Sequence, residues 1–314
     1  VLRQNYKAAI SSALILLYTR QYYGKYITVM LKKLIRKLRD PEKVRAEDRA
    51  RISFLLVTLA ETKTGAQLAA QMKSHKTRIL YDERLPAGEA AYRAIGNSVA
   101  LSPYGSEQAQ LLSLGHELRH VWQEKQGLLL RRHIHIFDHV VNVRASEADA
   151  YATQVQIAWE QHKKDPRAGY WAAAKKDEGA LCRVFEKVAQ RSEKYVENGA
   201  ARRAVFKAWL ETAHCRQYDY KAMRAVRGFW KGKAQGQRQG FMFNMQRNDG
   251  QTPYMSEAFL KEFGQMANGQ NYLQNMSLFK ATRLMHTSAA QDRYIARTSE
   301  KYPGSDDSMI YDHL

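Results

Sequence analysis

The chain has 314 residues, 45% of them hydrophobic and 26% charged, the balance of a water-soluble globular protein with length for one large or two ordinary domains. Its two cysteines, Cys182 and Cys215, lie far apart, so the sequence predicts neither a disulfide framework nor a thiol catalyst. No apolar run is long enough to cross a bilayer and no signal peptide is recognised, which predicts a cytoplasmic protein.

The net charge of +19 is concentrated in two flanks, Lys25–Arg49 and Arg202–Arg238. Within the first, the stretch Leu31–Arg39 repeats apolar residues at helical spacing, with its charges facing away. A basic amphipathic helix of this kind suits nucleic acid or an anionic membrane surface, although the solvated face of a packed helix has the same pattern. We therefore interpret residues 1–50 as a basic helical N-terminal region, separated from the core by Asp40-Pro41.

The core domain is predicted to span residues 51–165. It is expected to include a helix over Thr62–Met72, followed by a short strand over Arg78–Tyr81. Two more strands, Tyr92–Ile95 and Ser98–Leu101, are expected on either side of a Gly-Asn turn. They come directly before the helix that carries the most informative motif.

That motif is His116-Glu117-Leu118-Arg119-His120. Apolar residues recur at three- and four-residue steps around it, Ser106 is a suitable N-cap, and Gly127 is a suitable C-terminal stop. Histidines four residues apart lie on one face of a helix and can reach one metal ion, while the glutamate between them can take a proton from a metal-bound water. The pattern predicts half of a zinc hydrolase site, against the alternative of a surface helix that happens to carry two histidines.

A catalytic zinc site needs a third protein ligand and an open position for water. The glycine and histidine that extend this motif in metzincins are replaced by Gln123 and Gln126, so the third ligand must lie elsewhere. One source is the histidine-rich stretch with His133, His135 and His139, whose histidines are otherwise ordinary solvent-facing or hydrogen-bonded residues.

A second source is the acidic segment Ser146–Ala152, predicted to form a helix with a small-residue face that can approach the motif helix closely. Because Glu147 and Asp149 are two residues apart, they point about 200° apart on a helix, and only one can face the metal. We choose Glu147 as the third ligand. Asp149 then holds a histidine by its other nitrogen, or is an alternative ligand; both acids can also be solvated charges.

Asp165-Pro166 is expected to end this second helix. Residues 166–300 are predicted to form a mainly helical C-terminal region, and residues 301–314 a flexible tail. The predicted fold class is α+β, mainly helical, with a small β-sheet beside the motif helix. The helices of the C-terminal region are expected over Ala172–Lys194, Ala200–Tyr220 and Ser256 to about Arg297.

A helix reading HELRHVWQ, preceded by a strand and a turn and followed by EADAYA on a later helix, resembles the zincin-type metallopeptidases. It is similar in particular to the bacterial metallopeptidase family DUF6782, written around HELRHxxQ, over roughly residues 51–160. The resemblance implies zinc ligands at His116 and His120, a general base at Glu117 and an acidic third ligand in the EADA segment. In many gluzincins the ligand Glu stands four residues before a helical Asp, and that place is Ala145 here.

The resemblance also implies that the strand ahead of the motif, at Ser98 and Val99, binds an extended peptide at the sheet edge, unless it is a plain structural strand. The predicted function is a zinc-dependent peptidase that acts on peptide or protein substrates, with Zn²⁺ as cofactor and Tyr151 or Arg119 as candidates for stabilising the oxyanion. The alternative is a non-catalytic protein that binds nucleic acid or a membrane surface and whose HExxH is structural or vestigial.

Overall fold

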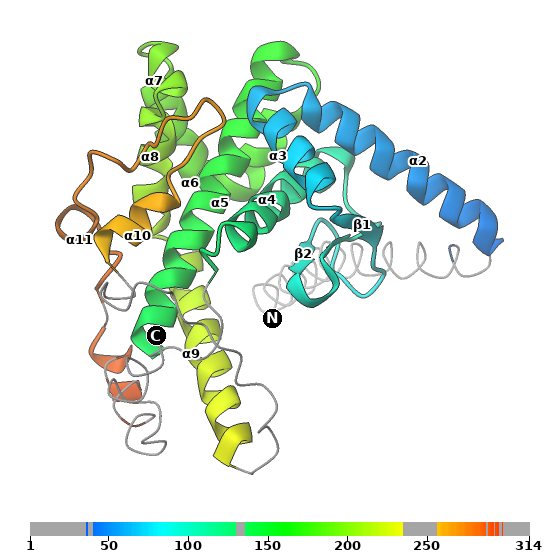
Figure 1. Cartoon of the computed structure of the whole chain (residues 1–314). Helices are drawn as coiled ribbons and strands as arrows, with labels where there is room; N and C mark the ends of the chain where they lie inside the picture. The colour runs from blue at the N-terminus through cyan, green and yellow to red at the C-terminus, as the bar shows by residue number, and fades with distance from the viewer. Residues whose placement is uncertain are drawn as a thin grey trace, which may run out of the picture.

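The computed structural model of the chain describes residues 36, 40–129, 136–234, 256–286, 288–291, 293, 294 and 297. Helices dominate these residues, and three short strands form one mixed sheet, which confirms the predicted α+β class (Figure 1). Within the described ranges, we find no helix with the length and apolar character needed to cross a bilayer. Four sequence predictions fall on residues outside these ranges: most of the amphipathic stretch Leu31–Arg39, the candidate ligands His133 and His135, and the tail 301–314.

Two N-terminal helices, α2 (Pro41–Ala60) and α3 (Lys63–Ser74), pack against each other and against the motif helix. The side chain of Asp40 caps α2 by accepting a hydrogen bond from the Glu42 N–H at 2.9 Å. Pro41 is the first residue of this helix, where the N–H that proline lacks has no helical partner in any case. The expected Asp-Pro boundary therefore marks the start of α2.

The sheet has the strand order β1-β3-β2. β1 (Arg78–Tyr81) pairs in parallel with β3 (Ser98–Leu101), and β2 (Ala90–Arg93) pairs antiparallel with β3 from the other side. A turn of 3-10 helix, η1 (Ala94–Gly96), connects β2 to β3. All four residues of the central strand are buried.

This order corrects the expected role of Ser98 and Val99. An added strand pairs only with an edge strand, whereas both sides of β3 already pair with its neighbours. The edge strand that packs against the motif helix is β2. Strand order could not be deduced from the sequence, because all three strands have similar lengths and compositions.

The motif lies on α4 (Glu107–Lys125), and both predicted helix ends are confirmed. The Ser106 hydroxyl accepts a hydrogen bond from the Ala109 N–H at 3.2 Å, and Gly127, just past the last turn, has a φ of +72°. The second site helix, α5 (Ile136–Lys164), lies at the centre of the molecule and packs against α4 (Figure 1). The two helices approach closely at Gly115, where a Cβ atom would lie 2.6 Å from Ile157 Cδ1.

The C-terminal region differs from its prediction in two places. The expected helix Ala200–Tyr220 is two helices, because the chain leaves the first after Trp209 and the Thr212 hydroxyl accepts a hydrogen bond from the Cys215 N–H in the second. The expected helical part from Ser256 is mostly an irregular loop, since its Asn-Gly-Gln-Asn sequence favours turns and Gly269 has a φ of +80°. The helices observed here are α6 (Tyr170–Ala189), α7 (Lys194–Glu197), α8 (Ala200–Trp209), α9 (Ala213–Ala234), α10 (Glu257–Glu262) and α11 (Leu278–Ala281).

One cluster of buried hydrophobic residues extends from Leu55 on α2 to Leu284 beyond α11. Helix α5 contributes to it and packs against α3, α4, α6, α8 and α9. The motif helix and the C-terminal helices therefore share a core, and α5 holds them together.

Candidate metal centre

The structure brings three of the predicted site residues together. His116 and His120 lie one turn apart on α4, with their Nε2 atoms 3.1 Å apart. Glu147 on α5 lies against both, its Oε2 atom 3.4 Å from His116 Nε2 and its Oε1 atom 3.5 Å from His120 Nε2. These side chains are only 8–12% exposed. Among the described residues, this is the group of histidine, cysteine and acidic side chains that could hold a metal ion.

His120 and Glu147 shift each other's pKa. Burial alone would lower the pKa of His120, but the negative charge and hydrogen bond of Glu147, together with the charge of Glu117, raise it to about 9. Burial likewise favours the neutral form of Glu147, yet the two histidines hold the pKa of this carboxyl well below its usual range. The cluster therefore attracts positive charge, either a proton or a metal cation.

The Nδ1 atoms of the two histidines have different environments. His120 Nδ1 lies 2.8 Å from Gln123 Oε1, so a hydrogen bond fixes the plane of this ring. His116 Nδ1 has no hydrogen-bond partner among the residues that the structure describes, and the ring of Tyr151 packs edge-on against His116 with a centroid distance of 4.7 Å. One ring is oriented by a hydrogen bond and the other by packing.

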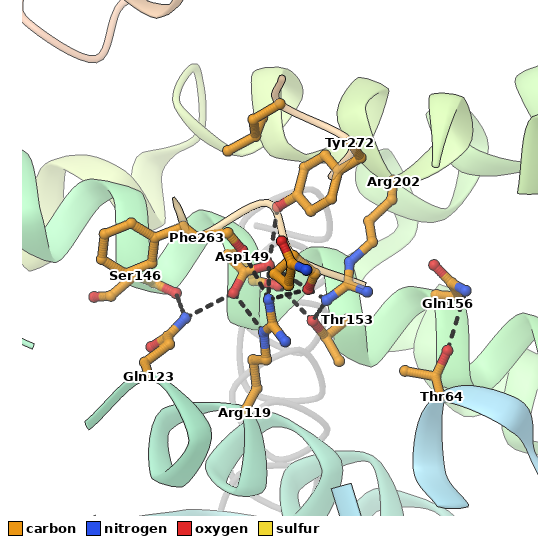
Figure 2. Close-up of polar contacts among 12 residues, drawn as sticks. Thr64, Arg119, Gln123, Ser146, Asp149, Thr153, Gln156, Arg202, Phe263 and Tyr272 are labelled. Atoms are coloured by element: carbon orange, nitrogen blue, oxygen red, sulfur yellow. Dashed lines mark hydrogen bonds and ion pairs between the residues drawn. The ribbon is translucent and has the colours of Figure 1, made fainter. Parts of the chain in front are cut away.

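Asp149 was expected to hold a histidine by its second nitrogen, but within the described part of the chain its carboxylate hydrogen-bonds no histidine. Its carboxylate is fully buried and accepts hydrogen bonds from Arg119, Gln123, Arg202 and Tyr272 (Figure 2). Because the two acids are two residues apart on α5, Glu147 faces the histidines and Asp149 faces a separate polar cluster. Asp149 is linked to His120 through Gln123, which bonds both.

The same cluster rules out Arg119 as an oxyanion group. Its side chain is 2% exposed and stacks on Trp122, with the guanidinium carbon 3.7 Å from the ring centroid. Besides Asp149, it donates to the carbonyl oxygen of Phe263 at 2.7 Å (Figure 2). It also donates to the carbonyl oxygen of Gln265 at 2.9 Å. All of these partners lie away from the metal-ligand candidates, because Arg119 precedes His120 by one residue and so points to a different side of α4.

Glu117 is held beside the histidines by the sheet. Its Oε2 atom accepts a hydrogen bond of 2.7 Å from the Tyr92 N–H on the edge strand β2. A cavity of about 340 Å³ opens here, lined by the three residues Ala90 to Tyr92 of β2 and by side chains of α4, α5 and α9. The α4, α5 and α9 residues that line it are His116, Glu117, His120, Ser146, Glu147 and Tyr218.

A model described as "Putative metallopeptidase family (DUF6782)" matches residues 36–273 of the chain. The chain belongs to this family. The match confirms the family resemblance and supports a peptidase function that depends on a metal. No curated protein and no solved structure matches the chain.

A larger cavity, of about 830 Å³, lies elsewhere in this DUF6782 protein, between α3, α5, α8 and the loop Met266–Gln270. None of the three metal-ligand candidates lines it, so the larger cavity is not the candidate metal centre. His139, the remaining histidine candidate, is buried on α5 and is not part of the group that could hold a metal.

Sequence reasoning missed two residues at this site, Gln123 and Tyr218. Gln123 lies three residues after His120, on the same helix face, so its spacing was a usable signal. Tyr218 comes from α9 and offered no signal, because its place depends on a buried ion pair between the next residue, Asp219, and Arg144 on α5 at 2.8 Å. Burial, followed by the charge of Glu147, raises the pKa of Tyr218, so its hydroxyl stays protonated.

Proposed function

We propose that this protein is a zinc-dependent peptidase whose metal ligands are His116, His120 and Glu147. The observation that carries the proposal is the close approach of the two imidazole nitrogens and the Glu147 carboxylate. Four ligands at zinc distances in a tetrahedron lie about 3.3 Å from one another. The two Nε2 atoms are 3.1 Å apart, and each lies close to one oxygen of the carboxylate, His116 at 3.4 Å from Oε2 and His120 at 3.5 Å from Oε1. Two imidazole nitrogens and one carboxylate oxygen also form a donor set typical of catalytic zinc, which keeps a fourth position open.

Zn²⁺ in this position supplies a Lewis acid that lowers the pKa of a coordinated water toward neutrality and polarises the scissile carbonyl. Glu117 is the general base that takes the proton of the attacking water and passes it to the leaving amine. The Tyr92 N–H anchors Glu117 Oε2, so we assign proton transfer to Oε1. The hydroxyl of Tyr218, which lines the same cavity, is our candidate donor to the developing oxyanion in place of Arg119.

The substrate is proposed to bind as an extended strand along β2 rather than along β3. Ala90, Ala91 and Tyr92 line the cavity together with the histidines and Glu117. The Tyr92 N–H points away from β3 and toward Glu117, which identifies the outer edge of β2 as the edge that faces the site. A peptide added there lies beside the general base.

The test is metal analysis and peptide cleavage with the purified full chain. We expect stoichiometric zinc in the wild type, its loss in His116→Ala, and retained zinc without peptide cleavage in Glu117→Gln. Tyr195→Phe, which alters an exposed tyrosine on α7, is the control and should keep both zinc and activity. Cleavage by Glu117→Gln at the wild-type rate would contradict the assigned base.

The same experiment tests the alternative of a non-catalytic binder of anionic partners. Two residues of the expected basic flanks form ion pairs within the protein: Arg36 with Asp48 and Glu83, and Arg202 with Asp149. These cations are therefore engaged internally. A metal-free wild type with salt-sensitive nucleic-acid binding would refute the peptidase proposal and favour the binder.

A further inference from the structure

The side-chain amide of Gln123 can adopt only one orientation in its surroundings. Its Nε2 atom lies 3.0 Å from the carbonyl oxygen of Ser146 and 2.8 Å from Asp149 Oδ2. Both of these atoms only accept hydrogen bonds, so the group facing them must be the NH₂. The amide oxygen therefore faces His120 Nδ1, at 2.8 Å, and can only accept a hydrogen bond from it.

This orientation determines the tautomer of the histidine. Because Gln123 Oε1 is an acceptor, His120 Nδ1 must carry a hydrogen. In the neutral imidazole the lone pair then lies on Nε2, the atom that faces His116 Nε2 and Glu147. We propose that Gln123, itself oriented by Asp149, is a positioning residue that prepares His120 to bind a metal through Nε2.

Asp149 can orient Gln123 because it is itself fixed from several sides. Arg119 donates to it at 2.6 and 3.2 Å, Arg202 at 3.3 Å and the Tyr272 hydroxyl at 2.9 Å (Figure 2). Its carboxylate is 0% exposed and the two arginine side chains are 2% exposed, so water does not compete for these bonds. A flip of the Gln123 amide would place its oxygen against this carboxylate, which is electrostatically unfavourable.

The inference rests on the proposed metal centre, and its test has two readouts that do not require catalysis. The first is the affinity for Zn²⁺, measured by competition with a chromogenic chelator. The second is the long-range ¹H–¹⁵N spectrum of the histidine side chains in the zinc-loaded full chain, with the His120 signals assigned by their loss in His120→Ala. We expect a protonated Nδ1 and a metal-bound Nε2 for His120 in the wild type.

Gln123→Leu removes the acceptor at nearly constant side-chain size, and we expect zinc affinity to fall about 10- to 100-fold. The matched control is Gln110→Leu. Gln110 is also a buried glutamine on α4, with hydrogen bonds to the carbonyl oxygens of Ser102 and Gly105, but it does not contact the metal-ligand candidates. A merely structural role for Gln123 predicts equal zinc affinities in the two variants.

The outcomes separate this inference from the proposed function. Equal affinity in Gln123→Leu and Gln110→Leu, or an unprotonated Nδ1 in the wild type, would overturn the positioning role even if the protein cleaves peptides. The expected spectrum and affinity loss in a protein that cleaves no peptide would support the positioning role while refuting the peptidase. A wild type that binds no Zn²⁺ overturns both.

Discussion

The buried carboxylate of Asp149 offers the sharpest test of how this fold is held together. Asp149→Asn preserves side-chain volume but removes the charge that faces two buried guanidinium groups, and it replaces one acceptor atom by a donor. Breaking a buried ion pair by removing one partner costs about 3–5 kcal/mol, because the other charge stays buried without compensation. Here Arg119 and Arg202 share the carboxylate, and Gln123 and Tyr272 also donate to it.

We therefore expect the free energy of unfolding of Asp149→Asn to fall by about 3–5 kcal/mol, a large part of the 5–15 kcal/mol typical of native proteins, and Tm to fall on the order of 10 °C. The assay is urea unfolding with a metal chelator present, so that zinc binding does not contribute to the difference. Asp165→Asn, at an exposed acid that accepts from the Arg167 N–H, is the control and should lie within about 0.5 kcal/mol of the wild type. Equal unfolding free energies for the two variants would refute the reasoning.

Three further substitutions test other parts of the structure. Gly199→Ala should cost about 2–4 kcal/mol in thermal unfolding, because its φ of +75° adds strain and its Cβ would lie 2.4 Å from Tyr272 Cβ. Gly269→Ala, at φ +80°, should cost only about 1–2 kcal/mol, because among the described residues no atom beyond its chain neighbours lies within 4 Å of an added Cβ. Tyr218→Phe should lower kcat about 10²-fold with little change in KM, if its hydroxyl stabilises the oxyanion; an unchanged kcat would remove it from that role. Burial raises the pKa of Glu178 from 4.5 to about 7. Between these two pH values the folded state binds more protons than the unfolded state, so the free energy of unfolding falls as pH rises from 4.5 to 7. Urea unfolding at pH 5 and pH 8 should show this fall, up to about 3 kcal/mol, in the wild type and not in Glu178→Gln; a variant with the wild-type pH dependence would contradict the assignment.

The parts of the site that the sequence could predict depend on local spacing. The helical period places His116 and His120 on one face of α4, and the same period separates Glu147 from Asp149 on α5. Helix ends such as Ser106 and Gly127 were predictable for the same reason, because capping depends on a few neighbouring residues. The resemblance to the DUF6782 family likewise rested on short local segments, HELRHVWQ with the strand and turn before it and EADAYA on a later helix.

The parts that could not be predicted depend on contacts between distant segments. The partners of Asp149 include Arg202 and Tyr272, which are 53 and 123 residues away in sequence. The strand order that buries β3 and leaves β2 at the edge is also a long-range property. The irregular loop after α10 replaced an expected helix, because Asn-Gly turns and contacts with Arg119 outweigh helical spacing there. In each case the local sequence was compatible with more than one tertiary arrangement.

The family match includes a loop that contributes to the polar cluster around Asp149. The match runs from residue 36 to residue 273, well beyond the helices that carry the metal-ligand candidates. Its last residues include Tyr272, whose hydroxyl bonds Asp149, and the loop whose carbonyl oxygens at Phe263 and Gln265 accept from Arg119. Without this loop, the buried guanidinium group of Arg119 would lose two acceptors, and the carboxylate that orients Gln123 would lose the Tyr272 hydroxyl as a donor. Helices α4 and α5 supply the candidate ligands, whereas the segment around residue 270 completes the polar cluster that stands behind them.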